Sequence, residues 1–170
     1  MGNDSLRYRI NFSPDSFKEL AKQLMQDPDY RVVDEARYRT VVSRFYYAVF
    51  LEIRERIRQF LQTLDAETFR LFMYFFKTGE IHAIIREILH LLDPFVGNIF
   101  SKLHLERRKA DYELDEYVGF PNAYKASKLV QKLQQRTAEQ TLRMLLNENL
   151  PKVNRALKAR VKRRRCHGRY

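Results

Sequence analysis

The chain has 170 residues, 45% of them hydrophobic, so it is long enough to bury one sizeable core and too short for two comfortable domains. Its net charge of +11 favours an anionic partner. The single cysteine excludes an internal disulfide, and no N-terminal apolar run resembles a signal peptide or a membrane-spanning helix. We therefore expect a cytoplasmic protein with no membrane partner.

The positive charge is concentrated at the C-terminal end. Residues 151–170 contain nine of the 32 Lys and Arg and no Asp or Glu. The 23 basic side chains of residues 1–150 nearly balance the 21 acidic ones. A block of like charge is typical of a solvated interaction arm. We therefore divide the chain into an N-terminal arm (1–12), a body (13–149) and a basic tail (150–170).

The first predicted helix covers 14–26. Ser13 followed by Pro14 is typical of an N-cap with proline in the first turn, and Phe12 and Phe17 have the spacing of a hydrophobic staple. Before this helix, apolar residues alternate over 6–12, which predicts a short extended arm.

A long helix is predicted over 32–63. Apolar residues recur there at intervals of three and four, as on one face of a helix: Val42, Phe45, Tyr46, Val49, Ile53, Ile57, Phe60 and Leu64. A second stripe lies beside this face and contains Ser43, Tyr47, Phe50, Arg54 and Leu61. Two such stripes predict a helix that is buried on more than one side.

Further helices are predicted over 66–77, 80–92, 95–116 and 122–147. The helix over 66–77 precedes Gly79, a residue suited to a helix C-cap. Short connections between consecutive helices favour antiparallel neighbours. The sequence therefore predicts an all-α fold, an up-and-down bundle of about five helices with a basic helical tail.

Most known catalytic signatures are absent from the sequence. It has no Gly-rich phosphate loop, no nucleophile elbow and no paired cysteines, so we expect neither a cofactor nor a metal. His82 and His90 are eight residues apart and can share a helix face, but His82 has no partner at the tight spacing of a zinc helix. Structural roles are the favoured interpretation for both. The Cys166-His167 pair is interpreted as incidental.

Polar side chains line one predicted helix between residues 103 and 112. His104, Arg108 and Tyr112 are four residues apart, and Arg107 is one turn from Asp111. A solvated charged face is the simplest interpretation of this pattern.

A second segment changes that interpretation. The run Ser-Arg-Phe-Tyr-Tyr-Ala at 43–48, together with Arg-Arg-Lys-Ala-Asp-Tyr at 107–112, resembles the small prokaryotic branch of the HEPN superfamily. The resemblance covers about residues 30–145. It implies a four- or five-helix bundle, a homodimer, a link to toxin–antitoxin, antiviral or RNA-processing systems, and an antitoxin or nucleotidyltransferase partner.

The sequence departs from the active ribonucleases of that superfamily, which carry an Arg and then a His four to six residues later. Here Arg107 is followed by Tyr112. A tyrosine with a pKa of about 10 is a poor general base at neutral pH, whereas a histidine with a pKa of about 6.5 is a good one. Arg107 can still bind a phosphate through its planar guanidinium, and His104 is the alternative base. The candidate catalytic residues are Arg107, Tyr112 and His104.

An internal polar network is the competing interpretation of the same residues. Its members are Arg44, Tyr47, Asp111 and Tyr112, with Arg44 paired to Asp111 across two helices. A structural network and a ligand-binding role are compatible.

The basic tail has the pattern of an amphipathic helix. Val153, Leu157 and Val161 recur every four residues, with basic side chains on the other faces. Such a helix can bind nucleic acid, an acidic protein or anionic lipid, but a stripe without Trp or Phe disfavours the membrane. The candidate nucleic-acid-binding residues are Arg107, Arg108, Lys158, Arg160, Lys162, Arg163, Arg164 and Arg165.

Two functional hypotheses follow. The first is an HEPN-like protein that binds or cleaves RNA, a metal-independent endoribonuclease in its enzymatic form, acting as the toxin-like component of a toxin–antitoxin or defence system. The alternative is a non-enzymatic dimeric interaction module whose tail binds nucleic acid or an acidic partner protein. A nucleotide pocket near Arg44 and Tyr112 is a third possibility.

Overall fold

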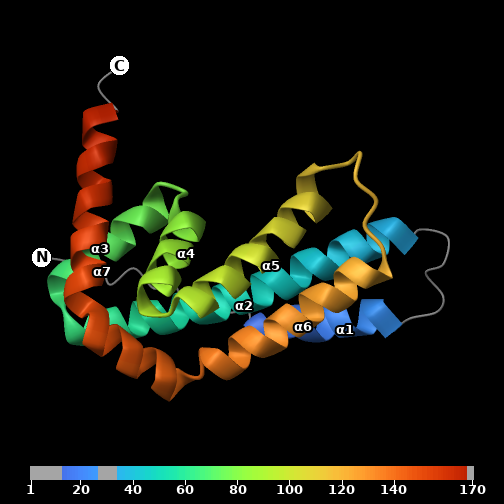
Figure 1. The fold of residues 1–170 in the computed structure, drawn as a ribbon, viewed down its shortest axis with the longest axis horizontal. Helices are drawn as coiled ribbons and strands as arrows, with labels where there is room; N and C mark the ends of the chain where they lie inside the picture. The colour runs from blue at the N-terminus through green and yellow to red at the C-terminus, as the bar shows by residue number, and fades with distance from the viewer. Residues whose placement is uncertain (1–12, 27–33, 168–170) are drawn as a thin grey trace, which may run out of the picture.

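The expected all-α fold is confirmed. The structure, a computed structural model, describes residues 13–26 and 34–167, and those residues form seven helices and no strand (Figure 1). The helices are α1 (Pro14–Gln26), α2 (Asp34–Leu64), α3 (Ala66–Lys77), α4 (Ile81–Leu92), α5 (Pro94–Tyr112), α6 (Phe120–Arg136) and α7 (Glu139–His167). Seven helices replace the expected bundle of about five. The expected arm over 1–12, including Phe12 of the staple, lies outside the described residues.

Local capping explains where the first helices begin and end. The Ser13 hydroxyl accepts the backbone N–H of Asp15 at 3.2 Å, as expected of an N-cap. Asp65 caps α3 by accepting the backbone N–H of Thr68 at 2.7 Å. After α3, Gly79 adopts a φ of 73°, which costs glycine no steric strain and lets the chain turn into α4.

The expected helix over 122–147 is interrupted. Thr137 ends α6, because its hydroxyl donates to the carbonyl oxygen of Leu133 at 2.8 Å and its own carbonyl accepts Arg56 of α2 at 2.8 Å. A carbonyl held by α2 directs the backbone out of the helix, and α7 begins two residues later. The sequence did not predict this break, because no glycine or proline lies near Thr137 to mark it.

The expected basic amphipathic helix is confirmed as the second half of α7. Pro151 lies inside α7, where it removes one helical hydrogen bond and favours a bend. Figure 1 shows α7 changing direction in the part that contains this proline. Beyond it, Val153, Leu157 and Val161 are buried. The boundary expected at residue 150 therefore falls within one continuous helix that packs on the body.

The long helix α2 is the centre of the fold. Its most buried large side chains include Tyr46 and Phe50, which share one core with Phe72, Phe75 and Phe100. Figure 1 shows α1, α5 and α6 lying along α2, while the second half of α7 runs across it beside α3 and α4. The elements are therefore not all arranged up and down. Within the described residues, no helix is long and apolar enough to cross a bilayer.

Candidate functional site

The two motif segments meet where α2 packs against α5. Arg107 of α5 donates from Nη2 to the hydroxyl of Tyr47 at 2.8 Å and to the hydroxyl of Tyr112 at 3.0 Å. Its Nε lies 2.6 Å from Oδ2 of Asp111. Burial opposes the charge of this guanidinium, but Asp111 and the two tyrosines raise the pKa of Arg107 above its ordinary value. Arg107 is therefore held permanently charged in a fixed orientation.

One nitrogen of Arg107, Nη1, remains able to bind a further anion. Nη1 has no hydrogen-bond partner among the described residues and is accessible to solvent. Nε is buried, and although it is close to Asp111, its N–H has no well-aligned acceptor. The ion pair with Asp111 therefore balances the charge of the guanidinium but does not use all of its donors.

The expected polar network forms with one change of partner. Tyr47, Asp111 and Tyr112 all contact Arg107. The expected pairing of Arg44 with Asp111 is wrong, because the Arg44 guanidinium lies over the ring of Phe17 in α1, 4.9 Å from its centroid. Arg44 therefore holds α1 on α2 by a cation–π contact.

A histidine pair lies beside Arg107. The hydroxyl of Tyr46, on α2, is 2.7 Å from Nδ1 of His82 on α4 and 3.2 Å from Nδ1 of His104 on α5. The Tyr46 ring is fully buried, and His82 stacks on Phe50 with ring centroids 3.9 Å apart. We call Tyr46, His82, His104 and Arg107 the arginine–histidine cluster.

Both histidines of this cluster are neutral at physiological pH. Burial, with Arg107 and His104 nearby, lowers the pKa of His82 to about 4. Burial, followed by Arg86 and Arg107, lowers the pKa of His104. Burial also raises the pKa of Tyr46 well above its usual range, so its hydroxyl stays protonated. A neutral imidazole can accept a proton from a ligand.

Two further arginines surround the histidine pair. Arg86 of α4 is exposed, and Arg54 of α2 stacks over the rings of Phe50 and Phe76, 5.8 and 5.2 Å from their centroids. Burial lowers the pKa of Arg54, and its Nε is buried without a partner. Neither arginine has an ion pair within the described part of the chain. The surroundings of the cluster are therefore strongly positive.

Two anchors fix the position of α5. The buried carboxylate of Glu106 accepts Lys125 at 2.5 Å and Asn122 at 3.2 Å, both on α6. At the end of α5, Arg39 of α2 donates to the carbonyl oxygens of Lys109 at 3.0 Å and Ala110 at 3.1 Å. A guanidinium on the last carbonyls acts as a C-cap. These contacts turn His104 and Arg107 toward α2.

The basic half of α7 is partly neutralised by the body. Arg160 donates to Glu80 at 2.9 Å and to Glu87 at 3.0 Å, and Arg164 donates to Glu80 at 2.6 Å. Lys158 pairs with Glu67 at 2.8 Å. Three of the expected nucleic-acid-binding side chains thus dock α7 on α3 and α4.

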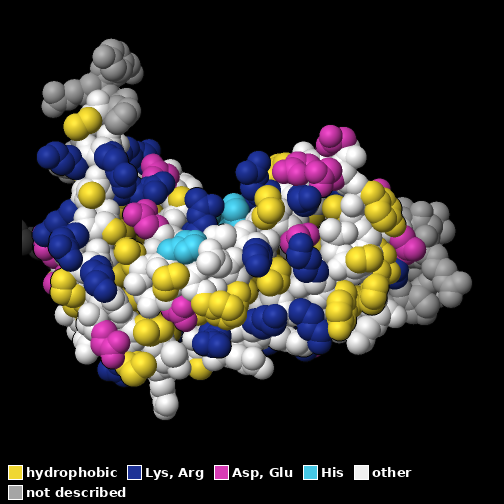
Figure 2. All heavy atoms as spheres, in the orientation of Figure 1, with side chains coloured by type: hydrophobic (Ala, Val, Ile, Leu, Met, Phe, Trp, Pro, Cys, Tyr) yellow, Lys and Arg dark blue, Asp and Glu magenta, His cyan; other side chains and the backbone are white. Residues whose placement is uncertain are grey.

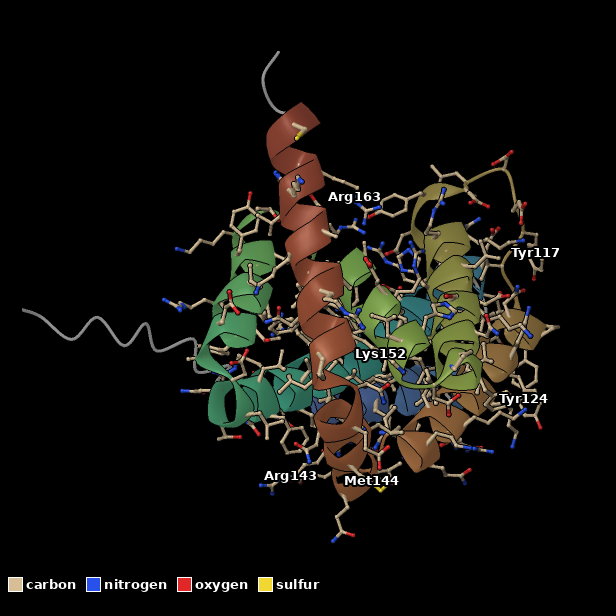
Figure 3. The ribbon with its side chains drawn as sticks, turned by 60° about the vertical axis from the view of Figure 1, so that its left-hand side comes forward. Tyr117, Tyr124, Arg143, Met144, Lys152 and Arg163 are labelled. Atoms are coloured by element: carbon tan, nitrogen blue, oxygen red, sulfur yellow. The ribbon has the colours of Figure 1, made fainter. Side chains whose placement is uncertain are left out.

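The remaining candidates of that set differ in their surroundings. Lys162 is exposed without an ion pair in the described part of the chain, and Arg108 is exposed with Glu113 3.9 Å away. Figure 3 shows Arg163 pointing from α7 toward the raised end of α5. The side chain of Arg165 lies outside the described residues.

The surface above α4 is hollowed. Figure 2 shows the hollow between the projecting end of α7 and the raised end of α5, with a histidine on its floor and Lys and Arg side chains beside it. An open depression of about 350 Å³ at the α7 side is lined by Glu80, Arg160, Arg163 and Arg164. Three arginines and one glutamate therefore line this side of the hollow, and the glutamate is paired with Arg160 and Arg164.

His90 is separate from this site, since its Nε2 lies 3.1 Å from the hydroxyl of Ser101. His82 and His90 therefore have different partners, and no group of three or more His, Cys, Asp or Glu in the described part of the chain is arranged to hold a metal.

Sequence reasoning missed the role of His82 and Arg39. Neither belongs to a motif with the residues it contacts: His82 is 36 positions from Tyr46, and Arg39 is 70 positions from Lys109. Only Arg39 had an available signal, because it lies four residues before Ser43 and so continues the second stripe on α2.

Two uncharacterized proteins of Methanocaldococcus jannaschii are similar in sequence to this chain. MJ0628 is 32% identical over 87 residues, which cover 48% of this chain and 52% of MJ0628. MJ0992 is 24% identical over 128 residues, which cover 68% of each protein. The chain thus spans about half the length of the first relative. No family model matches the sequence. No solved structure matches it either.

Proposed function

We propose that this chain is an HEPN-like protein that binds RNA in the hollow between α5 and α7 and cleaves it without a metal ion. One observation carries the proposal: a neutral histidine, His104, precedes the charged Arg107 by one turn on the same helix, inside a strongly positive environment. The pair supplies a base and a phosphate-binding group.

The chemistry follows from these two side chains. Nη1 of Arg107 donates to a phosphate oxygen, and Nε2 of His104 accepts the proton of the neighbouring 2′-hydroxyl. The 2′-oxygen then attacks phosphorus and leaves a 2′,3′-cyclic phosphate. Tyr112, which accepts a hydrogen bond from Arg107, orients the guanidinium in this scheme and is not the base.

The basic half of α7 extends the binding surface. Lys162 and Arg163 are exposed on α7, and Arg163 lines the depression at the α7 side of the hollow. Contacts with phosphates give affinity without sequence preference and weaken with salt. A toxin-like role in a toxin–antitoxin or defence system is the biological setting of this activity.

The test uses the purified full chain and a labelled RNA oligonucleotide in a buffer with EDTA. His104→Gln should reduce the cleavage rate about 100-fold or more and change the RNA Kd less than about threefold. Arg107→Ala should lower both the rate and the affinity. Arg136→Ala, at the far end of α6 from the cluster, should match the wild type.

The substrate and the product provide two further checks. A DNA oligonucleotide of the same sequence lacks the 2′-hydroxyl and should stay intact. The 5′ fragment of the RNA should end in a cyclic phosphate. Equal RNA integrity at all times with wild type, His104→Gln and Arg107→Ala would rule out cleavage. In cells, growth arrest by the wild type that Arg107→Ala relieves would support the toxin-like role.

A dimeric interaction module is the second candidate, favoured by exposed apolar side chains. Leu114 and Tyr117 on the α5–α6 connection and Phe120 and Tyr124 on α6 lie close together in sequence and are exposed. Figure 3 shows Tyr117 and Tyr124 at the side of the molecule away from α7. Phe120→Glu should convert a dimer to a monomer in sedimentation velocity, and a wild-type monomer would contradict this candidate.

A further inference from the structure

The hydroxyl of Tyr46 is shared by two imidazoles. Tyr46 contacts Nδ1 of His82 at 2.7 Å and Nδ1 of His104 at 3.2 Å. The three side chains come from α4, α2 and α5, and the hydroxyl belongs to a fully buried ring. No water is needed to connect one histidine with the other.

The shared hydroxyl constrains the proton positions of the two imidazoles. A hydroxyl has one hydrogen, so Tyr46 donates to one Nδ1 and accepts from the other. A neutral imidazole has one N–H. The two rings are therefore opposite tautomers: one carries its proton on Nδ1 and has an accepting Nε2, and the other carries its proton on Nε2.

Both outer nitrogens are at least partly accessible to solvent. Neither Nε2 is hydrogen-bonded to a described residue, and neither is a buried atom without a partner. The ring centroids of His82 and His104 lie 6.3 Å apart, so one phosphodiester can reach both rings. The cluster thus presents one acceptor and one donor to the same ligand.

We propose that His104, Tyr46 and His82 form a proton relay, in which uptake of a proton at Nε2 of His104 releases a proton from Nε2 of His82. This inference rests on the proposed RNA cleavage and names the general acid of that reaction. His104 is the base, because it lies one turn from Arg107. The shorter contact, 2.7 Å, is then the O–H of Tyr46 donating to His82.

The proton transfers balance. The 2′-hydroxyl gives its proton to Nε2 of His104, and the Nδ1 proton of His104 moves to the oxygen of Tyr46. The hydroxyl proton of Tyr46 moves to Nδ1 of His82, and the Nε2 proton of His82 moves to the 5′-oxygen. The O2′–P bond forms while the P–O5′ bond breaks. Both rings end in the other tautomer, and exchange with water at the two Nε2 atoms restores them.

The relay carries no net charge, which suits its surroundings. A histidinium beside Arg54, Arg86 and Arg107 would be repelled, whereas a tautomer exchange keeps both rings neutral. The positive groups therefore bind the phosphate while the histidines move protons.

The first test reads the tautomers directly. Nitrogen NMR of histidine-labelled full chain at pH 7 should give the Nδ1–H form for His104 and the Nε2–H form for His82. In Tyr46→Phe, which keeps the ring and removes the hydroxyl, this opposed pattern should be lost while His90 is unchanged. Two rings of the same tautomer in the wild type would overturn the relay, whether or not the protein cleaves RNA.

The second test uses the cleavage rate. Tyr46→Phe and His82→Gln should each lower kcat by about 10- to 100-fold with an unchanged KM, and the double variant should lose no more than the stronger single one. Tyr74→Phe on α3, a half-buried tyrosine outside the cluster, is the matched control and should keep the wild-type kcat. A chain that cleaves RNA equally well with Tyr46→Phe refutes the relay and leaves the proposed function standing.

Discussion

Arg107 on α5 donates to the hydroxyl of Tyr47 on α2 at 2.8 Å and so joins the two segments that carry the sequence motifs. The same Nη2 donates to Tyr112, which closes the network on its own helix. A single guanidinium therefore both holds α5 against α2 and presents an open donor to a ligand.

The structural part of this role can be measured without a ligand. Arg107→Ala should lower the free energy of unfolding by about 2 kcal/mol, because the hydroxyl of Tyr47 and the carboxylate of Asp111 lose a charged partner. Urea denaturation at pH 7 gives the value. Arg108→Ala, its exposed neighbour, should change the same quantity by less than about 0.5 kcal/mol. Equal stability of the two variants would contradict the network.

Acid should destabilise the fold through His82. Its pKa is about 4 in the folded protein and about 6.5 when unfolded, so between these values the unfolded chain binds a proton that the folded chain does not. Stability should therefore be full above pH 6.5 and fall as the pH drops to 4. Because part of the ring contacts water, we expect a loss of about 1–2 kcal/mol.

The variant His82→Gln tests this pH dependence. It should flatten the slope of unfolding free energy between pH 6.5 and 4, measured by urea denaturation at several pH values. His104 titrates in the same direction and remains in both proteins, so the difference isolates His82. An identical slope in wild type and variant would contradict the assignment.

The docking of α7 should depend on its apolar stripe. Leu157 is buried in the shared core, and Leu157→Ala should cost about 2–4 kcal/mol of unfolding free energy. Lys162→Ala, on an exposed face of the same helix, should cost less than about 0.5 kcal/mol. A harmless Leu157→Ala would mean that α7 does not pack on the body in solution.

Charge on α7 should contribute to RNA affinity according to position. Arg163 lines the depression at the α7 side of the hollow, and Figure 3 shows Arg143 toward the other end of the same helix. Arg163→Gln should weaken binding and reduce the slope of log Kd against log salt by about 0.7, the value for one phosphate on a single strand. Arg143→Gln should leave the slope unchanged. Equal effects would indicate binding by overall charge alone.

Deleting the whole tail is a poor substitute for these changes. Removal of residues 151–170 also removes Val153, Leu157 and Val161 from the core. Loss of binding would then be mixed with loss of packing, whereas a single charge change at Arg163 leaves the core intact.

Helix positions were largely predictable because local signals set them. Proline after serine marked the start of α1, and Gly79 marked the end of α3, so both helices have the expected bounds. The break at Thr137 was not predictable, because it depends on Arg56 from another helix. The amphipathic pattern of the tail predicted its helix correctly. An apolar residue at every fourth position is a property of the sequence alone, and the structure buries these residues.

The sequence by itself determined most of the helices, the basic tail and the placement of Arg107 one turn from both His104 and Asp111, because these are properties of spacing along the chain. Only the tertiary structure decided which residues share a hydrogen bond. In the structure Arg44 contacts Phe17 instead of Asp111, and His82 contacts Tyr46. Arg160 of the tail binds Glu80 and Glu87. Contacts between helices depend on how each helix is rotated and packed, and no local pattern encodes that rotation.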